Sequence, residues 1–356
     1  MIKVFNGFYE RYFSEEEAII FTLLLVIFFT VMMTLGSIIA PLLWSLVLTF
    51  LLQGLVSSLE KLHMHHRMAV YLVYFMFVGL TVLTMFVFLP FAWNRIIFFI
   101  NDMPIVMEQS RALLMLLPEN YPEVFTADQV QLWLNSIQQE VGLIAKNIFS
   151  YSFSSVPLIA SVMVYLVLVP IMVFFMLKDS EKLLNWFESW LPEKRPVMAQ
   201  IWHEMNDQLG NYIRGKALQM IIMGMASFSV FTLLGLNYSL LLSVLIGLSV
   251  IVPFLGATFI IVPIFLVGFF QWGFSADLYQ VMIIYFVLHL IDANILVPLI
   301  FSETVKLHPI AILTAVLVFG GIWGFWGVFF AIPLATFIKA IIRAWPIKGQ
   351  AIAPSM

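Results

Sequence analysis

Long apolar runs recur along almost the whole chain, and they limit what it can fold into. Only 10% of the 356 residues are charged, whereas a soluble domain carries about 25%. Most of the runs approach or exceed the about 20 residues that a helix needs to cross a bilayer. We predict an all-α polytopic membrane protein with about eight membrane elements, at residues 18–36, 38–52, 68–93, 156–177, 217–236, 238–271, 278–299 and 309–342. A turn at Gly36-Ser37 would join the first two into a helical hairpin.

Composition also argues against several kinds of chemistry. There is no cysteine, so disulfides, thiol catalysis and thiolate metal sites are excluded. A net charge of −3 gives no reason to expect a nucleic-acid partner. No Walker A loop or HExxH motif occurs, and the histidines at 63, 65 and 66 lack an accompanying carboxylate or cysteine pattern. We therefore expect no enzyme, no metal site and no cofactor.

Two stretches are too polar for the membrane interior. Residues 94–155 are polar but patterned, which predicts a small extramembrane helical hairpin, with a capping box formed by Thr126 and Gln129. Residues 178–216 carry six lysines and arginines. Leu183, Leu184 and Phe187 lie on one apolar face of this second stretch, as in helices that rest in the membrane interface.

The basic residues predict the topology, because lysine and arginine near span ends stay in the cytoplasm. Loops 53–67 and 178–216 should share one side, and the basic-poor stretch 94–155 should lie on the other. Both termini are then cytoplasmic. The predicted organisation is N-terminal membrane helices at 1–93, a periplasmic helical hairpin at 94–155, a membrane helix at 156–177, a cytoplasmic amphipathic linker at 178–216, a C-terminal transport core at 217–346 and a tail at 347–356.

Two late segments resemble each other at an offset of 71 residues. Residues 236–263 align with 307–333, so that Leu236 matches Leu307 and Gly256 matches Gly327. Each consists of two apolar halves joined by a glycine-containing breaker, PFLG in the first and GGIWGFWG in the second. Since one span separates them, we predict two broken helical hairpins of opposite orientation, an arrangement that many secondary transporters use around their substrate. Chance similarity between leucine- and glycine-rich sequences is the alternative.

A family resemblance is carried by EMNDQLGNYIRGK (204–216), GLNYSLLLSVLIGLSVIVPFLGA (235–257), DANILVPLIFSETVKLHP (292–309) and FGGIWGFWGVFFAIPLATFIKA (319–340). With these motifs the chain resembles PerM-type permeases of the autoinducer-2 exporter family over essentially its full length. The resemblance implies a bacterial inner-membrane protein that exports small solutes or exchanges ions. Ala257 stands where relatives often have proline, and Asp292 where many have glutamate.

The resemblance also implies a set of site residues by motif position. They are Pro253 and Gly256 at the first break, Asp292, Asn294, Pro298, His308 and Pro309 in the following motif, and Gly321, Gly324, Gly327 and Pro333 at the second break.

Asp292 is the strongest candidate on physical grounds as well. A charge at membrane depth costs about 2.5–3.5 kcal/mol on insertion scales, so it usually serves a function. Its carboxyl group could alternate between protonated and ionised forms, or it could merely satisfy a broken backbone. Asn294 offers a donor and an acceptor nearby. His289 lies three residues earlier on the same helical face, where it could relay a proton or simply pack.

Two further groups have open roles. Glu303 and His308 lie in the polar turn SETVKLH, where they could gate transport or sit at the surface with Lys306. Ser243 and Ser249 could contact a ligand through their hydroxyls, or could bond within ordinary helices.

These observations together predict a secondary transporter or permease. It would export a small solute, such as an autoinducer-2-like molecule, or exchange ions, with H⁺ or Na⁺ as the coupling ion. The expected partners are the lipid bilayer and a small-molecule or ion substrate, and a seam of apolar residues at 130–148 leaves a homo-oligomer open. The alternative function is a non-catalytic membrane scaffold or regulator.

Overall fold

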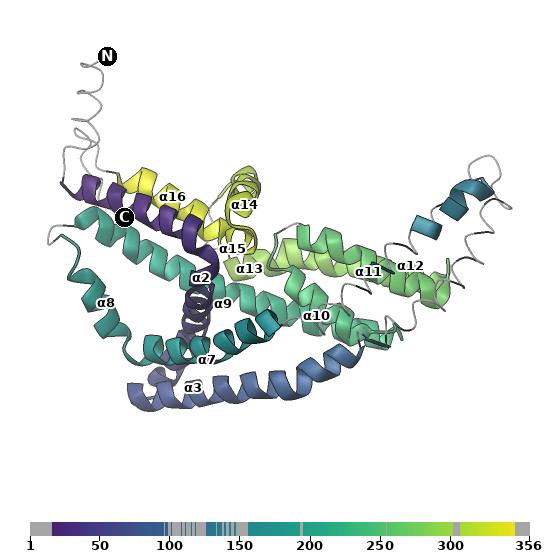
Figure 1. The fold of residues 1–356 in the computed structure, drawn as a ribbon, viewed down its shortest axis with the longest axis horizontal. Coiled ribbons are helices and arrows are strands. Elements are labelled where there is room, and N and C mark those ends of the chain that lie inside the picture. Colours follow the sequence, from purple (N-terminus) through teal and green to yellow (C-terminus); the bar gives the residue numbers. More distant parts are fainter. Residues whose placement is uncertain are drawn as a thin grey trace, which may run out of the picture. The chain divides into compact units, whose positions relative to one another are not determined.

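The computed structural model describes residues 16–95, 156–192, 195–253, 255–301 and 307–345, with scattered positions between 97 and 146. These residues form helices and turns, and none of them lies in a strand. The chain divides into two compact units. Unit 1 holds residues 1–74, 167–217 and 300–356, and unit 2 holds residues 75–166 and 218–299. Figure 1 labels the helices in chain order.

The N-terminal helix of unit 1 is longer than either span predicted for it. α2 covers Glu16–Lys61, with a non-helical residue, Leu35, at φ −116° and ψ 15°. The helix resumes directly afterwards, so the chain kinks at Leu35, next to the hairpin turn that the sequence predicts at Gly36-Ser37. α3 (His66–Leu83) follows and continues into η1, a π-helical turn at Thr84–Phe88.

A carboxylate from α2 holds the start of the longest later helix. α9 covers Pro196–Leu233, and Glu17 Oε1 accepts a hydrogen bond of 2.7 Å from the Met198 N–H in its first turn. Helix N-termini carry unsatisfied N–H groups and favour negative charge, so this buried glutamate is stabilised there. Around the contact, Val197 and Ile201 pack against Ala340 of α16 (Ala331–Ala344).

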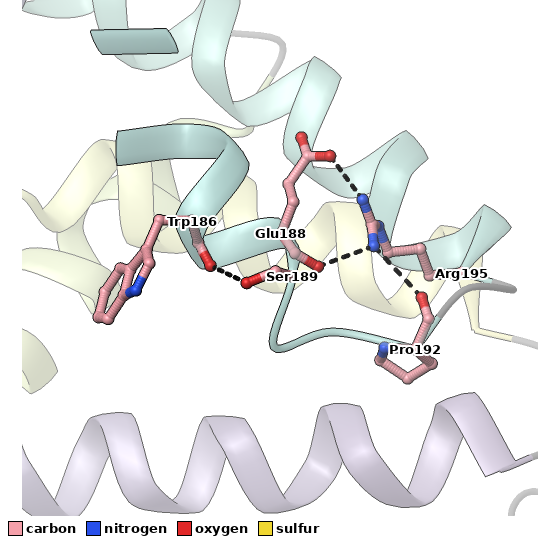
Figure 2. Close-up of polar contacts among 5 residues, drawn as sticks. All are labelled: Trp186, Glu188, Ser189, Pro192 and Arg195. Atoms are coloured by element: carbon pink, nitrogen blue, oxygen red, sulfur yellow. Dashed lines mark hydrogen bonds and ion pairs between the residues drawn. The ribbon is translucent and has the colours of Figure 1, made fainter. Parts of the chain in front are cut away.

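The basic linker contains a short helix and a tightly bonded turn. α7 (Val156–Lys178) meets α8 (Ser180–Glu188) at a bend of 81°. After α8, the Arg195 guanidinium donates to Glu188 Oε2 at 2.6 Å and to the Glu188 and Pro192 carbonyls, while Ser189 Oγ bonds the Trp186 carbonyl (Figure 2). Five donors on one fork allow arginine to hold several acceptors of a turn at once.

The large apolar side chains of α8 stay exposed. The set comprises Leu183, Leu184, Trp186 and Phe187. This exposure fits the interfacial helix expected for the linker. α9 then continues through residue 217, where the sequence suggests that the linker gives way to the transport core.

Unit 2 contains a helical group with a continuous apolar core. Its helices are α10 (Ser239–Ser249), α11 (Leu255–Trp272), α12 (Ala276–Ile291) and the π-helical turn η2 (Asp292–Leu296), which leads into α13 (Val297–Phe301). Phe231, Ile246, Ile264 and Val281 are buried at its centre. A Cβ on Gly247 of α10 would lie 2.9 Å from the Met220 carbonyl of α9, so the two backbones approach as closely as glycine-mediated membrane helices do.

Six helices in the described part of the chain are long and apolar enough to cross a membrane, or seven if the bent α7–α8 pair is one span. The six are Glu17–Gly36, Ile38–Lys61, His66–Arg95, Pro196–Leu233, Leu255–Trp272 and Ala276–Phe301. α10 and α14 (Pro309–Trp323) are apolar but shorter. The all-α polytopic prediction is thus confirmed, while the count of eight elements and the opposite orientation of the two hairpins stay predictions.

The predicted extramembrane hairpin falls mostly outside the described residues. The part that is described includes its capping box, in which the Gln129 N–H bonds Thr126 Oγ1 at 3.3 Å and the Thr126 N–H bonds Gln129 Oε1 at 3.2 Å. This local prediction is confirmed.

Candidate transport site

The first break in the repeat lies between α10 and α11. α10 ends at Ser249, and a turn that contains Pro253 connects it to α11 at Leu255. A Cβ on Gly256 would stand 1.8 Å from the Ser249 carbonyl oxygen, a separation that no side chain tolerates. Glycine is therefore required at 256 so that α11 can start directly against the end of α10.

A tyrosine from α12 bonds the backbone beside this break. Tyr285 is only 3% exposed, and its hydroxyl donates to the Ala257 carbonyl at 2.5 Å. A hydrogen bond of this kind contributes about 0.5–1.5 kcal/mol net, so it stabilises this position. Tyr285 was not among the residues singled out from the sequence.

His289 follows Tyr285 by one helical turn. The two rings meet edge to face, with centroids 4.5 Å apart. The Nε2 atom of His289 is buried and has no hydrogen-bond partner among the described residues. Since histidine can donate or accept through this nitrogen, the position can receive a proton, a water or a ligand atom.

Asp292 begins the π-helical turn of this span, in which the Val297 N–H bonds the Asp292 carbonyl. Single π turns inside helices are frequent at functional sites. The Asp292 carboxyl group is half-buried, and its Oδ1 accepts a hydrogen bond of 2.7 Å from Gln219 Nε2. Gln219 comes from α9 and is only 2% exposed. It is the second residue of this site that sequence reasoning missed.

Asn294 does not join Asp292. It is exposed, and its amide donates to the Leu290 carbonyl of its own helix at 2.9 Å. The hydroxyls of Ser243 and Ser249 likewise bond carbonyls of their own helix, those of Ser239 and Ile246. These bonds favour the ordinary-helix alternative for both serines.

The second break belongs to unit 1 and lies between α14 and α16. Gly324 separates α14 from the short α15 (Phe325–Phe329) and has φ 59° and ψ −130°, a conformation open essentially to glycine alone. A Cβ on Gly327 would lie 1.8 Å from the Phe319 carbonyl oxygen. A Cβ on Gly321 would meet no other atom within 4 Å, so this third candidate glycine lies on an open part of its helix.

A tyrosine also bonds the backbone at the second break, but its surroundings are aromatic. The hydroxyl of Tyr212, 2% exposed on α9, donates to the Phe329 carbonyl at 2.9 Å. Trp44 of α2 packs edge to face on Trp326, with centroids 4.9 Å apart. One turn after Tyr212, the buried Lys216 ammonium lies 5.6 Å from the centre of the Phe301 ring, a cation–π contact.

The polar turn before α14 is only partly described. His308 is exposed and caps α14, because its Nδ1 accepts a hydrogen bond of 3.3 Å from the Ile310 N–H. Pro309 occupies the first helical position, which suits proline. Glu303 lies outside the described residues. No three His, Cys, Asp or Glu side chains in the described part of the chain could jointly hold a metal ion.

Comparisons with known proteins agree on one family. The model of the AI-2E family transporter matches residues 19–347. The permease PerM of Escherichia coli (strain K12) is 42% identical over 350 residues, which cover 98% of this chain and 99% of that protein. The transport protein YueF of Bacillus subtilis (strain 168) is 25% identical over 84% of this chain and 82% of its own. The names are provisional, and they describe permeases or transport proteins rather than enzymes. The chain belongs to the AI-2E family of transporters.

Proposed function

We propose that this protein is a secondary transporter of the bacterial inner membrane, in which Asp292 is the acid that couples solute movement to H⁺ or Na⁺. The observation that carries the proposal is the hydrogen bond between the Asp292 carboxyl group and the buried Gln219, at a π-helical turn. Membership of a transporter family supplies the general activity.

The site places several polar groups one after another along one span. From the first break it runs through the Ala257 carbonyl, the Tyr285 hydroxyl and the His289 ring to the Asp292 carboxyl group. His289 and Asp292 are three residues apart, so they share a helical face. Ionisable residues at this depth are typical of proton and ion pathways. A proton or Na⁺ bound at Asp292 would thus stand one helical turn from His289 and two turns from Tyr285, whose hydroxyl bonds the backbone at the first break.

In this proposal, the two breaks are the segments that move during transport or that face the substrate. Backbone that departs from regular helix at membrane depth is tolerated where it faces protein or a watery cavity. Broken segments of opposite orientation would give the alternating access that secondary transport needs. Export of an autoinducer-2-like solute follows from the family name, and ion exchange is the second substrate class that the same site can serve.

The membrane placement is part of the proposal. Both termini and the basic linker with α8 lie in the cytoplasm, which the positive-inside rule favours. The exposed apolar face of α8 then rests in the cytoplasmic leaflet. If copies of the chain associate, the apolar residues of the seam at 130–148 that do not pack within their own hairpin would make the contact.

Ion flux through purified protein in liposomes tests the proposal. Vesicles that contain the pH indicator pyranine receive an outward or inward Na⁺ gradient, and the rate of internal pH change is recorded. We expect Asp292→Asn to lower this rate at least about tenfold, because the neutral amide cannot exchange a proton or neutralise a cation. The matched control is Asp277→Asn, which removes an acid at the start of the same helix and should leave the rate unchanged.

Two outcomes would contradict the proposal in different ways. An undiminished rate in correctly folded Asp292→Asn protein would remove Asp292 from coupling while leaving transport intact. A wild-type protein that moves neither H⁺, Na⁺ nor any of a panel of labelled small solutes would favour the scaffold or regulator alternative.

A further inference from the structure

The helices that precede the two broken segments share a pattern of their own. On α9, Tyr212 is followed by Lys216 and Gln219. On the span that begins with α12, Tyr285 is followed at the same spacing by His289 and Asp292. Both sets read as tyrosine, a basic residue four positions later and a polar residue three positions after that. The sets are 73 residues apart, close to the offset of 71 between the broken segments.

Equivalent residues of the two sets make equivalent contacts. Tyr285 donates to the carbonyl of Ala257, one residue after Gly256. Tyr212 donates to the carbonyl of Phe329, two residues after Gly327. A Cβ added to either glycine would stand 1.8 Å from a preceding carbonyl oxygen. The repeat therefore includes the preceding helices, and each tyrosine bonds the break of the other repeat.

The last members of the two sets bond each other. Gln219 Nε2 donates to Asp292 Oδ1 at 2.7 Å. The third residues of the two sets, which are equivalent by their spacing, are therefore hydrogen-bonded to each other. The architecture is shared, but only one of the two positions carries a charge.

We propose that Gln219 is the repeat counterpart of Asp292 and acts with it as one two-residue coupling site, whose hydrogen bond is strong when the carboxylate is empty and weak when it holds H⁺ or Na⁺. This rests on the proposed function above. Hydrogen bonds to an ionised acceptor are roughly twice as strong as neutral ones. Loading the carboxylate would therefore loosen the contact between α9 and the turn that begins at Asp292, which ties occupancy to helix movement.

Few ionisable groups lie close to this pair along its own described helices. Within two helical turns of Asp292 on its span they are His289 and Tyr285, and within one turn of Gln219 on α9 there is Lys216. Residues 239–272, which form α10 and α11, contain no ionisable side chain. In residues 239–299 the acids are Asp277 and Asp292, and Asp292 is the one that bonds Gln219.

Exchanging the two side chains tests the equivalence. The same pyranine and Na⁺-gradient assay is applied to Asp292→Gln, Gln219→Asp and the double exchange in full-length protein. We expect each single variant to lose flux at least about tenfold and the exchange to recover it to within about threefold of wild type. The matched control is Asp292→Gln combined with Asn294→Asp, which places the acid on the exposed face and should not recover flux.

A pH profile separates a coupling role from a structural one. Gln219→Met removes the hydrogen-bond donor at similar volume. A coupling role predicts that the pH profile of flux moves relative to wild type, whereas loss of packing alone would lower the rate without moving the profile. Failure of the exchange to recover flux, with an unchanged profile for Gln219→Met, would overturn the inference while Asp292 remained the coupling acid.

Thermal unfolding tests the pair without any flux. If wild-type protein shows no H⁺ or Na⁺ movement, the proposed function fails, but the pairing still predicts that the exchange recovers at least about half of the Tm lost in either single variant. An exchange less stable than both single variants would show that the two positions are not equivalent.

Discussion

The two breaks are built alike at the backbone and differently at the side chains. In each, a glycine in the helix after the break lies directly against an earlier carbonyl, and a buried tyrosine hydroxyl bonds the nearby backbone. The first break leads through Tyr285 to His289, Asp292 and Gln219. The second is packed among aromatic rings, including Trp44 and Trp326.

This difference distinguishes the residues that form a break in a helix from the residues that would bind the coupling ion. Glycine and tyrosine recur in both places, so they belong to the geometry of a broken helix. Among the described residues, an acid lies next to the first break and none lies at the second, so under the proposed function we expect the second break to serve shape and movement rather than ion binding. Substitutions at matched positions can therefore separate the two roles.

The largest effect is expected at the matched glycines. Gly256→Ala and Gly327→Ala each force a methyl group to within 1.8 Å of a carbonyl oxygen, so we expect both to destabilise at or beyond the upper end of the about 1–3 kcal/mol typical of overpacking. Thermal unfolding of detergent-purified protein measures this. Gly321→Ala is the control, because its site is open and helical alanine is favoured by about 0.5–1 kcal/mol. Equal stability of all three variants would show that the backbone at the breaks can shift to accommodate a methyl group without cost.

The tyrosines should give an intermediate effect that distinguishes the two breaks. Tyr212→Phe and Tyr285→Phe each remove the hydroxyl that donates to a backbone carbonyl, at a cost of about 0.5–3 kcal/mol in unfolding free energy. We expect Tyr285→Phe also to lower coupled flux per folded molecule, because Tyr285 supports His289, and Tyr212→Phe to leave it near wild type. Tyr279→Phe, at an exposed position of α12, is the control for both. Equal flux losses in the two variants would argue against a division of roles.

The smallest effect is expected at the aromatic packing of the second break. Trp44→Leu removes an edge-to-face pair worth about 0.5–1.5 kcal/mol beyond buried area. The unfolding temperature should fall slightly, and the coupling ratio of ion to solute should not change. Trp190→Leu, on the exposed surface after α8, serves as the control. A changed coupling ratio in Trp44→Leu would show that the second break takes part in ion coupling.

Positions that disrupt helices were predictable, whereas contacts between distant helices were not. Pro253, Gly256 and Gly327 could be found because proline and glycine act locally on the backbone. Gln219 was missed because a single glutamine in an apolar helix has no local signature, and its partner lies 73 residues away. The repeated spacing of tyrosine, basic and polar residues could have identified both Gln219 and Tyr285.

The contacts of Asp292 and Asn294 could not be predicted from the sequence either, although the two residues are close together in the chain. The sequence places them two residues apart, yet one bonds α9 and the other bonds its own helix. The π-helical turn that begins at Asp292 could not be foreseen, because neighbouring helices and not local propensity decide where an extra residue fits.

That π-helical turn also has a consequence for how this span can evolve. A π turn accommodates one residue more than an α turn, here between Asp292 and Val297. Deleting one residue of 293–296 would restore a regular helix and leave the faces of the flanking segments nearly aligned. The same deletion elsewhere in the span would rotate everything beyond it by about 100°. The chain can thus lose one residue directly after its acid while the rest of the span keeps its packing.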